Sequence, residues 1–183
     1  MNIFYLHKDP EISAKMHCDK HVVKMIIEYA QLMSTAHRIL DGDEYEGKTK
    51  IGRRIRRWKH PNKNIENTIY KASHINHPSA VWARTSVANY IWLYKLFEKL
   101  CDEYTFRYGK THASITKLKD ALYFHPDNIE DKEGMTTLAQ AMPEEYKDED
   151  PTVAYRNYCI NEKHYAKWER GRGKPTWWTK EEV

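Results

Sequence analysis

The chain has 183 residues, of which 40% are hydrophobic and 13% aromatic, and this composition excludes a disordered protein. No apolar run approaches the roughly 20 residues of a membrane span, and the start, MNIFYLHKDP, lacks the pattern of a signal peptide. The net charge of +4 is a local property, because eight basic residues and no acidic one lie between positions 48 and 63, which leaves −4 for the rest of the chain.

Residues 1–6 are rich in Ile, Phe, Tyr and Leu, which predicts a short N-terminal strand or an extended arm. Asp9-Pro10 is a favourable helix start, with Asp as the cap and Pro at the first helical position. Apolar residues then recur at helical spacing to about Leu40 without Gly or Pro. We expect one long helix here, or two helices joined near 17–19, ending at 41–43.

The remaining elements follow from the same signals. Residues 42–73 show little periodicity and are predicted to be a basic loop, or a short helix between flexible segments. Further helices are predicted from Pro78 to about Tyr108, over about 113–124, and from Pro151 to about Glu169. Residues 127–150 read as an acidic loop, and the irregular C-terminal tail carries Trp177 and Trp178, which can pack back on the body. The predicted fold is mainly α, a compact single-domain helical bundle spanning 1–183.

Cys18, Cys101 and Cys159 are isolated and odd in number, so neither a disulfide framework nor a zinc ribbon is indicated. This use of cysteine favours the reducing cytoplasm, which would be the host cytoplasm for a phage-encoded protein.

Polar side chains form a narrow stripe on the first predicted helix. At about 100° per residue, they fall within about 60° of one line; they are His17, His21, Lys24, Glu28, Gln31, Thr35 and Arg38. Imidazoles move protons near neutral pH, and a nearby carboxylate can orient them. The stripe is therefore either a catalytic surface or the solvent-facing side of an amphipathic helix. Its catalytic candidates are His17, His21, Lys24 and Glu28.

His17 and His21 are four residues apart, so both rings could reach one metal ion. Zinc sites on helices use this spacing but need a third ligand. We predict no metal and no cofactor, and keep a small metal-dependent hydrolase as an alternative.

A second polar group, His74, Asn76 and His77, precedes Pro78, where a helix is expected to begin. The free N–H groups at a helix N-terminus suit a phosphate or a developing anion. His77 is a catalytic candidate here, and Asn76 and Arg84 are candidates for substrate binding. Ordinary helix capping would produce the same pattern.

The third group is the basic cluster within KTKIGRRIRRWKHPNKN. Each Lys or Arg that contacts a phosphate releases a counterion, and Trp58 could stack on an exposed base. A solvated loop is the alternative interpretation. The residues predicted to contact a nucleic-acid backbone are Lys50, Arg53, Arg54, Arg56, Arg57 and Lys59.

Two of these segments together resemble a known family. DKHVVKMIIEYAQL (19–32) is similar to the first helix of pyrimidine-dimer DNA glycosylases, in which an Asp is followed by Lys five residues on, Glu nine on and Gln twelve on. The matching residues are Asp19, Lys24, Glu28 and Gln31. INHPSAVWARTSVANYIWLYKLFEKLCDEYTFRYG (75–109) resembles the family's Asn-His-Pro stretch and the helix after it. The likeness covers roughly 15–110, and the remainder resembles uncharacterised small proteins of tailed phages.

The resemblance implies a helical protein that binds duplex DNA and removes a damaged base with an amine nucleophile, through a Schiff base at the sugar assisted by a glutamate. Glu28 would then shuttle a proton or stabilise a cation, and Lys24 would orient the backbone. The family's nucleophile is an N-terminal amine exposed after Met removal. Here Asn2 should leave Met1 in place, so the amine would belong to Met1, and His21 stands where the family has Arg.

The leading hypothesis is therefore a DNA-processing enzyme that excises damaged or modified pyrimidines. It predicts that the helix stripe and the His77 region face one cleft, with the basic cluster at its rim. The alternatives are a non-catalytic nucleic-acid-binding phage accessory protein and the metal-dependent hydrolase. The residues expected to bind substrate are Asp19, Gln31, Asn76, Arg84 and Asn89.

Overall fold

The first predicted helix is divided into two in the computed structural model, which describes residues 1–112 and 115–180. Helix α1 (Pro10–Met16) begins where expected, because the Asp9 carboxylate accepts hydrogen bonds from the backbone N–H groups of Glu11 and Ile12. Helix α2 (Asp19–Asp41) follows after a break at residues 17–18, where the backbone is extended. Of the two arrangements predicted for this segment, the structure has the one with two helices.

The helix predicted over 78–108 is also divided. Helix α4 (Pro78–Ala83) ends at Arg84, and Ser86 starts α5 (Val87–Tyr108) by accepting a hydrogen bond from the backbone N–H of Asn89. Ser86 is therefore a helix start within the range predicted as one helix. Helix α5 ends as predicted at Gly109, whose φ of 64° places it in the left-handed region that glycine adopts readily.

The later elements are shorter than predicted. Helix α6 (Ile115–Leu122) lies inside the predicted range 113–124, of which residues 113–114 are outside the described part of the chain. A 3₁₀ turn, η1 (Glu144–Tyr146), interrupts the acidic loop. Helix α7 (Pro151–Glu162) starts on an Asp150 cap and stops about two turns before the predicted end at Glu169.

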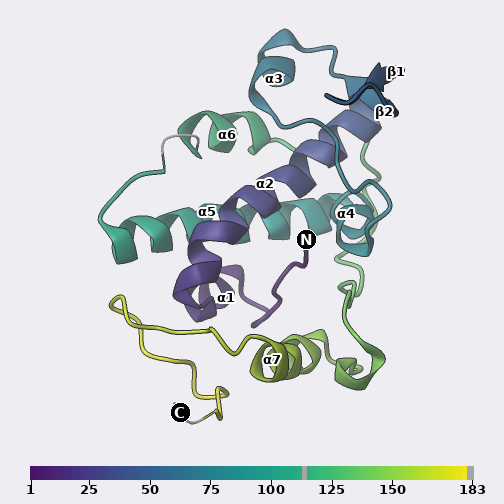
Figure 1. Ribbon diagram of the computed structural model, residues 1–183. Helices are drawn as coiled ribbons and strands as arrows, with labels where there is room; N and C mark the ends of the chain where they lie inside the picture. The colour runs from purple at the N-terminus through teal and green to yellow at the C-terminus, as the bar shows by residue number, and fades with distance from the viewer. Residues whose placement is uncertain (113–114, 181–183) are drawn as a thin grey trace.

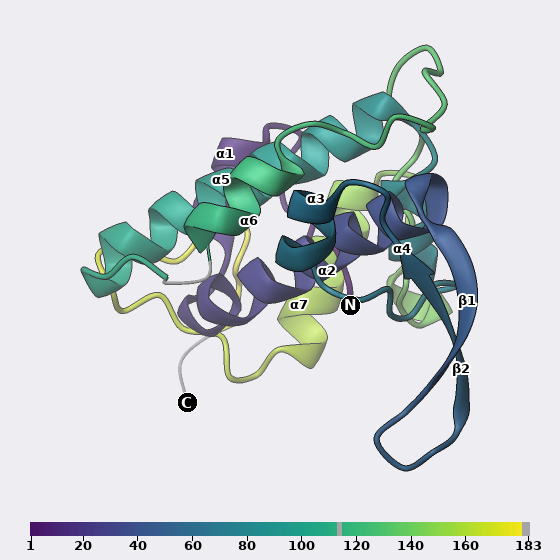
Figure 2. The same ribbon diagram turned by 90° about the horizontal axis from the view of Figure 1, so that it is seen from above.

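The segment 42–73 contains a short helix, one of the two alternatives predicted, but most of its basic residues lie on a hairpin that was not predicted. Strand β1 (Asp43–Lys48) pairs antiparallel with β2 (Arg54–Lys59), and helix α3 (Lys63–Thr68) follows. Asp43 and Glu46 on β1 lie opposite Lys59 and Arg56 on β2. The Arg56 guanidinium also binds the diagonal Glu44 carboxylate through two hydrogen bonds of 2.6 and 3.0 Å. Such cross-strand pairs stabilise a hairpin but leave no helical periodicity in the sequence. Figure 2 shows the hairpin projecting from the helical body.

The base of the hairpin is fixed by Arg38, a buried member of the polar stripe on α2. Its guanidinium donates to the backbone carbonyls of Trp58, Ile69 and Tyr70 and pairs with the Glu66 carboxylate. Arg38 thereby links α2 to both the end of β2 and the segment after α3, so the hairpin is anchored although its tip is exposed.

Helices α1 and α2 pack against α5 around one hydrophobic cluster, whose largest fully buried side chains include Tyr29, Tyr90, Phe97 and Tyr155 (Figure 1). Trp178 belongs to this cluster, so the prediction that the C-terminal tail packs back on the body is confirmed. The fold is mainly α, as predicted. Among the described residues, no helix is both long and apolar enough to cross a membrane.

The N-terminal segment is an extended arm, without strand pairing, that inserts into this core. Ile3 and Leu6 are almost fully buried. Its backbone N–H groups are bonded by side chains of the helices: Phe4 N–H donates to the Tyr29 hydroxyl and Leu6 N–H to Ser13 Oγ, both at 3.2 Å. A buried backbone group without a partner is costly, so these two bonds hold the arm against α2 and α1.

Candidate functional site

The buried arm brings the N-terminal amine to the polar side of α2. The Met1 amine nitrogen lies 3.4 Å from Glu28 Oε2, and Lys24 Nζ lies 3.4 Å from Glu28 Oε1. The Glu28 side chain is 17% exposed and Lys24 is 59% exposed, so the carboxylate sits between a sheltered amine and a solvated one. In both views the N-terminus lies beside α2 and near α4 (Figures 1 and 2).

His77 belongs to the same group. It caps α4, and its Nδ1 accepts a 3.1 Å hydrogen bond from the backbone N–H of Ser79, so in the neutral ring the proton is on Nε2. Burial lowers the pKa of His77, electrostatic interactions with the Met1 amine and with His74 lower it further, and the interaction with Glu28 opposes them. The ring is therefore neutral near pH 7 and close enough to the amine and the carboxylate to sense both charges.

A groove of about 460 Å³ adjoins this group, between the hairpin and the segment before α4. One wall is formed by residues 72–77, including Asn76 and His77, and the other by Ile55, Arg56 and Trp58 of β2. His74, on the first wall, has a φ of 48°. Left-handed backbone is uncommon for a non-glycine residue and, where present, often lies at a functional site.

The structure thus brings together three of the predicted catalytic residues, Glu28, Lys24 and His77, and places Asn76 and Arg56 at the adjoining groove. The Met1 amine was considered in the sequence only through the family resemblance. The apolar character of the first segment, MNIFYL, is the signal in the sequence that residue 1 is held against the core.

His17 does not belong to this group, and its prediction as a catalytic residue is not supported by its surroundings. The ring is fully buried, Nδ1–H donates to the Ser13 carbonyl, and Nε2 accepts from the Tyr29 hydroxyl, both at 2.7 Å. Burial lowers the pKa of His17 to about 4. With both nitrogens bonded inside the core, His17 has no atom left to offer a substrate.

His21 is also a core residue. Its ring stacks on Phe4 at 4.3 Å between centroids, Nε2 bonds the Tyr165 hydroxyl at 2.9 Å, and burial lowers its pKa to about 3. The centroids of the His17 and His21 rings are 6.5 Å apart, and the ring planes are inclined by 68°. Because three of their four nitrogens are already bonded, the predicted alternative of a metal ion held by this pair is not supported.

Two predicted substrate-binding residues instead have structural partners. Asp19 pairs with Arg107 at 3.0 Å and accepts the backbone N–H of Glu169 at 2.7 Å. The Asn89 amide is fully buried and bonds the Trp82 carbonyl and both the hydroxyl and the backbone N–H of Thr136. The sequence shows that these residues are polar and lie on helices, but it does not show which distant groups form hydrogen bonds with them. For this reason the sequence alone predicts them as substrate contacts.

The two other predicted substrate-binding residues are less constrained. Gln31 is half-buried on α2, three residues beyond Glu28. Arg84 is half-buried after α4, and its buried Nη1 has no hydrogen-bond partner within the described part of the chain. Burial lowers the pKa of Arg84.

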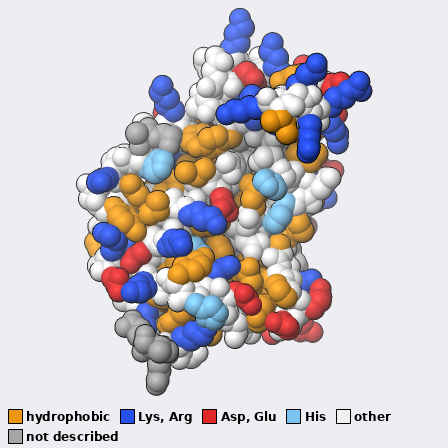
Figure 3. All heavy atoms as spheres, viewed as in Figure 1, with side chains coloured by type: hydrophobic (Ala, Val, Ile, Leu, Met, Phe, Trp, Pro, Cys, Tyr) orange, Lys and Arg blue, Asp and Glu red, His pale blue; other side chains and the backbone are white. Residues whose placement is uncertain are grey.

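The hairpin carries the predicted backbone-binding residues. Arg54 and Arg56 pair with Glu46 and Glu44 on β1, while within residues 1–112 and 115–180 no ion pair involves Lys50, Arg53 or Lys59. Arg57 is half-buried and donates to the Ala72 carbonyl. Lys and Arg side chains gather over the hairpin, and histidine side chains lie on the same face (Figure 3). Trp58 is 7% exposed and lies under Arg56, so it does not offer an open face to a base.

Comparison of the chain with protein-family models, with curated proteins and with solved structures finds no match. The resemblance to pyrimidine-dimer glycosylases therefore stays a prediction from two sequence segments.

Proposed function

We propose that this chain is a DNA base-excision enzyme that acts on damaged or modified pyrimidines, with the Met1 α-amine as nucleophile and Glu28 as its proton acceptor. The observation that carries the proposal is the 3.4 Å separation between the Met1 nitrogen and Glu28 Oε2 in a sheltered position. An α-amine is less basic than a lysine amine, so a larger share of it is neutral and nucleophilic near pH 7.

The reaction follows from these groups. The neutral amine attacks C1′ of the deoxyribose, the bond from C1′ to the base nitrogen breaks, and the base leaves with the electron pair and takes up a proton from solvent. The amine gives up one proton to Glu28, which passes it to the ring oxygen as the bond from C1′ to that oxygen breaks, and a protonated Schiff base between Met1 and C1′ results. Loss of a proton from C2′ then expels the 3′ phosphate and cleaves the strand.

His77 and the groove supply the remaining requirements. The Nε2–H group of His77 can donate a hydrogen bond to the departing base or to the ring oxygen of the sugar. The imidazole is already neutral near pH 7, so it does not have to lose a proton before the reaction. An enzyme that attacks C1′ must displace the nucleotide from the base stack. The groove beside His77 offers a place for a displaced nucleotide, and the hairpin cations lie where the flanking phosphates would pass.

The test is borohydride trapping on duplex DNA that carries an abasic site, alongside duplexes with damaged or modified pyrimidines. The abasic duplex tests the amine chemistry without base recognition. We expect a covalent adduct whose peptide map places the sugar on Met1. An adduct on Lys24 would instead make the exposed amine the nucleophile, and would overturn the role given to Met1.

Three variants define the site. Glu28→Gln should reduce trapping by about 10²–10⁴-fold, the usual contribution of a general base. A Gly-Ser extension before Met1 moves the free amine by up to about 7 Å and should abolish trapping. Glu11→Gln, an exposed glutamate in a lysine pair on α1, is the matched control and should leave trapping unchanged.

The intact mass of the purified protein, measured first, checks that Met1 carries a free amine. DNA binding without a trapped adduct on any duplex, including the abasic one, would refute the enzyme and favour the non-catalytic binding protein.

A further inference from the structure

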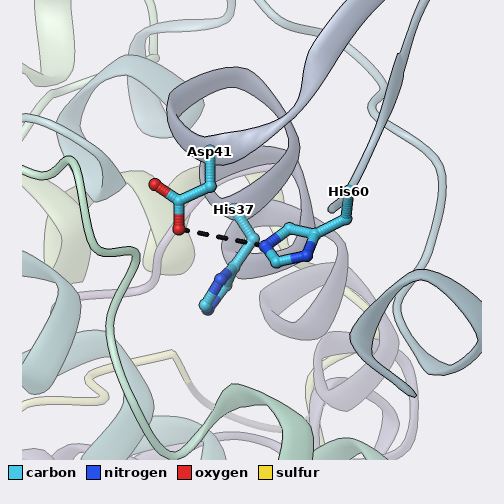
Figure 4. A group of neighbouring side chains, drawn as sticks. All are labelled: His37, Asp41 and His60. Carbon is cyan, nitrogen blue, oxygen red and sulfur yellow. Dashed lines mark ion pairs between the residues drawn. The ribbon is translucent and has the colours of Figure 1, made fainter. Parts of the chain in front are cut away.

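Three side chains outside the Met1–Glu28 group converge near the far end of α2. His37 and Asp41 are four residues apart on this helix, and His60 directly follows β2. One ring nitrogen from each histidine and one carboxylate oxygen all lie within 4.8 Å of one another, and Asp41 Oδ2 is 3.8 Å from His60 Nε2 (Figure 4).

Two nitrogens of this group are buried without a partner. His37 is 2% exposed and His60 is 6% exposed, yet His37 Nδ1 and His60 Nε2 form no hydrogen bond with the described residues. Burying a polar atom without a partner is costly, so nearly all such atoms in folded proteins are satisfied by protein, water or an ion. These two atoms therefore need a partner, which a water molecule or an ion can supply.

The surroundings of His37 prepare its ring to act as a ligand. The Tyr90 hydroxyl donates to the Leu122 carbonyl, so it can accept from His37 Nε2 at 2.9 Å, and the Phe124 carbonyl accepts from the same nitrogen at 3.1 Å. The ring proton is thus held on Nε2, and the lone pair is left on Nδ1.

Asp41 is held in a similar way. Its Oδ2 accepts the backbone N–H of Asp127 at 2.8 Å, and its Oδ1 accepts the backbone N–H and the side-chain amide of Asn128, both at 2.9 Å. These donors stabilise the ionised carboxylate and fix its orientation. Metal ligands in proteins are oriented by outer hydrogen bonds of this kind.

We propose that His37 Nδ1, Asp41 Oδ2 and His60 Nε2 bind a divalent transition-metal ion of the zinc class. Imidazole and carboxylate donors suit such ions, and three protein ligands with one water complete a tetrahedral shell. Bond lengths of about 2.0–2.2 Å place the donors of such a shell about 3.4 Å apart, so the side chains have to approach by about an ångström.

His60 needs one further change to bind. Its Nδ1 accepts the backbone N–H of Asn62 at 3.1 Å, which places the proton of the neutral ring on Nε2. Binding through Nε2 moves this proton to Nδ1, so the contact with Asn62 must lengthen when the ion enters. The ion would join the end of α2 to the start of the α3 segment and, through Asp41, to residues 127–128.

The test uses the full chain, stripped with a chelator and titrated with Zn²⁺ and, separately, with Co²⁺, whose visible absorption reports the coordination. We expect saturation at one ion per chain and a higher thermal midpoint. His60→Gln and Asp41→Asn should each weaken the affinity for the metal ion by more than about tenfold. Removing only a residue that supports a metal ligand already weakens metal binding by about 10- to 100-fold, so removing a ligand should cost at least the smaller of these values. His164→Gln, at an exposed histidine outside the group, should bind like the original chain.

If the variants do not fold, Co²⁺ binding by the original chain still tests the proposal. No saturable Co²⁺ absorption at one equivalent would overturn the proposal, and so would a folded His60→Gln variant that binds with the original affinity. Metal binding is measured without DNA, so this result is independent of the trapping experiment.

Discussion

Buried histidine makes the stability of this protein depend on pH in a way that can be calculated. His17 has no exposed surface, and its ring uses one nitrogen as a hydrogen-bond donor and the other as an acceptor. A second proton on the ring would therefore bury a charge. It would also place two donors, His17 Nε2–H and the Tyr29 hydroxyl, against each other. Burial accordingly lowers the pKa of His17 to about 4 from 6.5. Replacing it with Gln removes the titration while keeping a donor and an acceptor.

The sign follows from proton uptake. Between pH 6.5 and about 4 the unfolded chain holds a proton on this histidine and the folded chain does not, so the free energy of unfolding falls as the pH falls through this range. At about 1.4 kcal/mol per unit of pKa difference, His17 costs about 2 kcal/mol between pH 7 and pH 5. Ordinary carboxyl groups titrate mainly below this interval. Burial also lowers the pKa of His21, to about 3, so the original chain loses more than the His17 part, and the comparison with a His17 variant isolates that part.

Urea unfolding followed by tryptophan fluorescence at pH 7 and pH 5, with a chelator present, measures this quantity. His17→Gln should be less stable than the original chain at pH 7, but should lose about 2 kcal/mol less on going to pH 5. Exposed His164 offers the control, because His164→Gln should show the original pH dependence. An unchanged pH dependence in His17→Gln would refute the description of His17 as a neutral core residue.

Two further predictions concern charged residues. The Arg107 side chain is fully buried between Asp19 and Glu103, so Arg107→Ala should lower the free energy of unfolding by about 3–5 kcal/mol, because Asp19 loses its ion-pair partner and Glu103 keeps only Arg172. A loss below about 1 kcal/mol in urea unfolding would contradict this. Arg53 at the hairpin tip should contact a phosphate, so Arg53→Ala should reduce the slope of log affinity against log salt by about 1 on duplex DNA. Lys132→Ala, in the acidic loop and paired with Glu130, should leave that slope unchanged; equal slopes for all three proteins would exclude the hairpin tip from the interface.

The candidate active site depends on the N-terminal arm as much as on α2. Phe4 and Leu6 donate their backbone N–H groups to side chains of α2 and α1, and the buried Ile3 and Leu6 hold the arm in the core. The same contacts set the position of the Met1 amine beside Glu28. A part of the chain that stabilises the fold thereby also places the proposed nucleophile.

Local signals determined most of the helices. Caps such as Asp9 and Asp150, the terminating Gly109 and the apolar spacing along α2 and α5 act within a few residues of one another, so they can be read directly from the sequence. The same reading missed the hairpin, because the pairing of Glu44 and Glu46 with Arg56 and Arg54 depends on residues that are 8 to 12 positions apart and lie on two strands.

The sequence by itself also placed Lys24, Glu28 and His77 among the candidates, but could not separate them from His17, His21, Asp19 and Asn89. The tertiary structure made that separation, because it shows which polar atoms are already bonded to distant groups: His17 to Tyr29, Asp19 to Arg107 and Asn89 to Thr136. It also brought His60 to His37 and Asp41, which no spacing in the sequence relates. Helical periodicity is a property of neighbouring residues, whereas burial and hydrogen-bond partners are decided only when the whole chain packs.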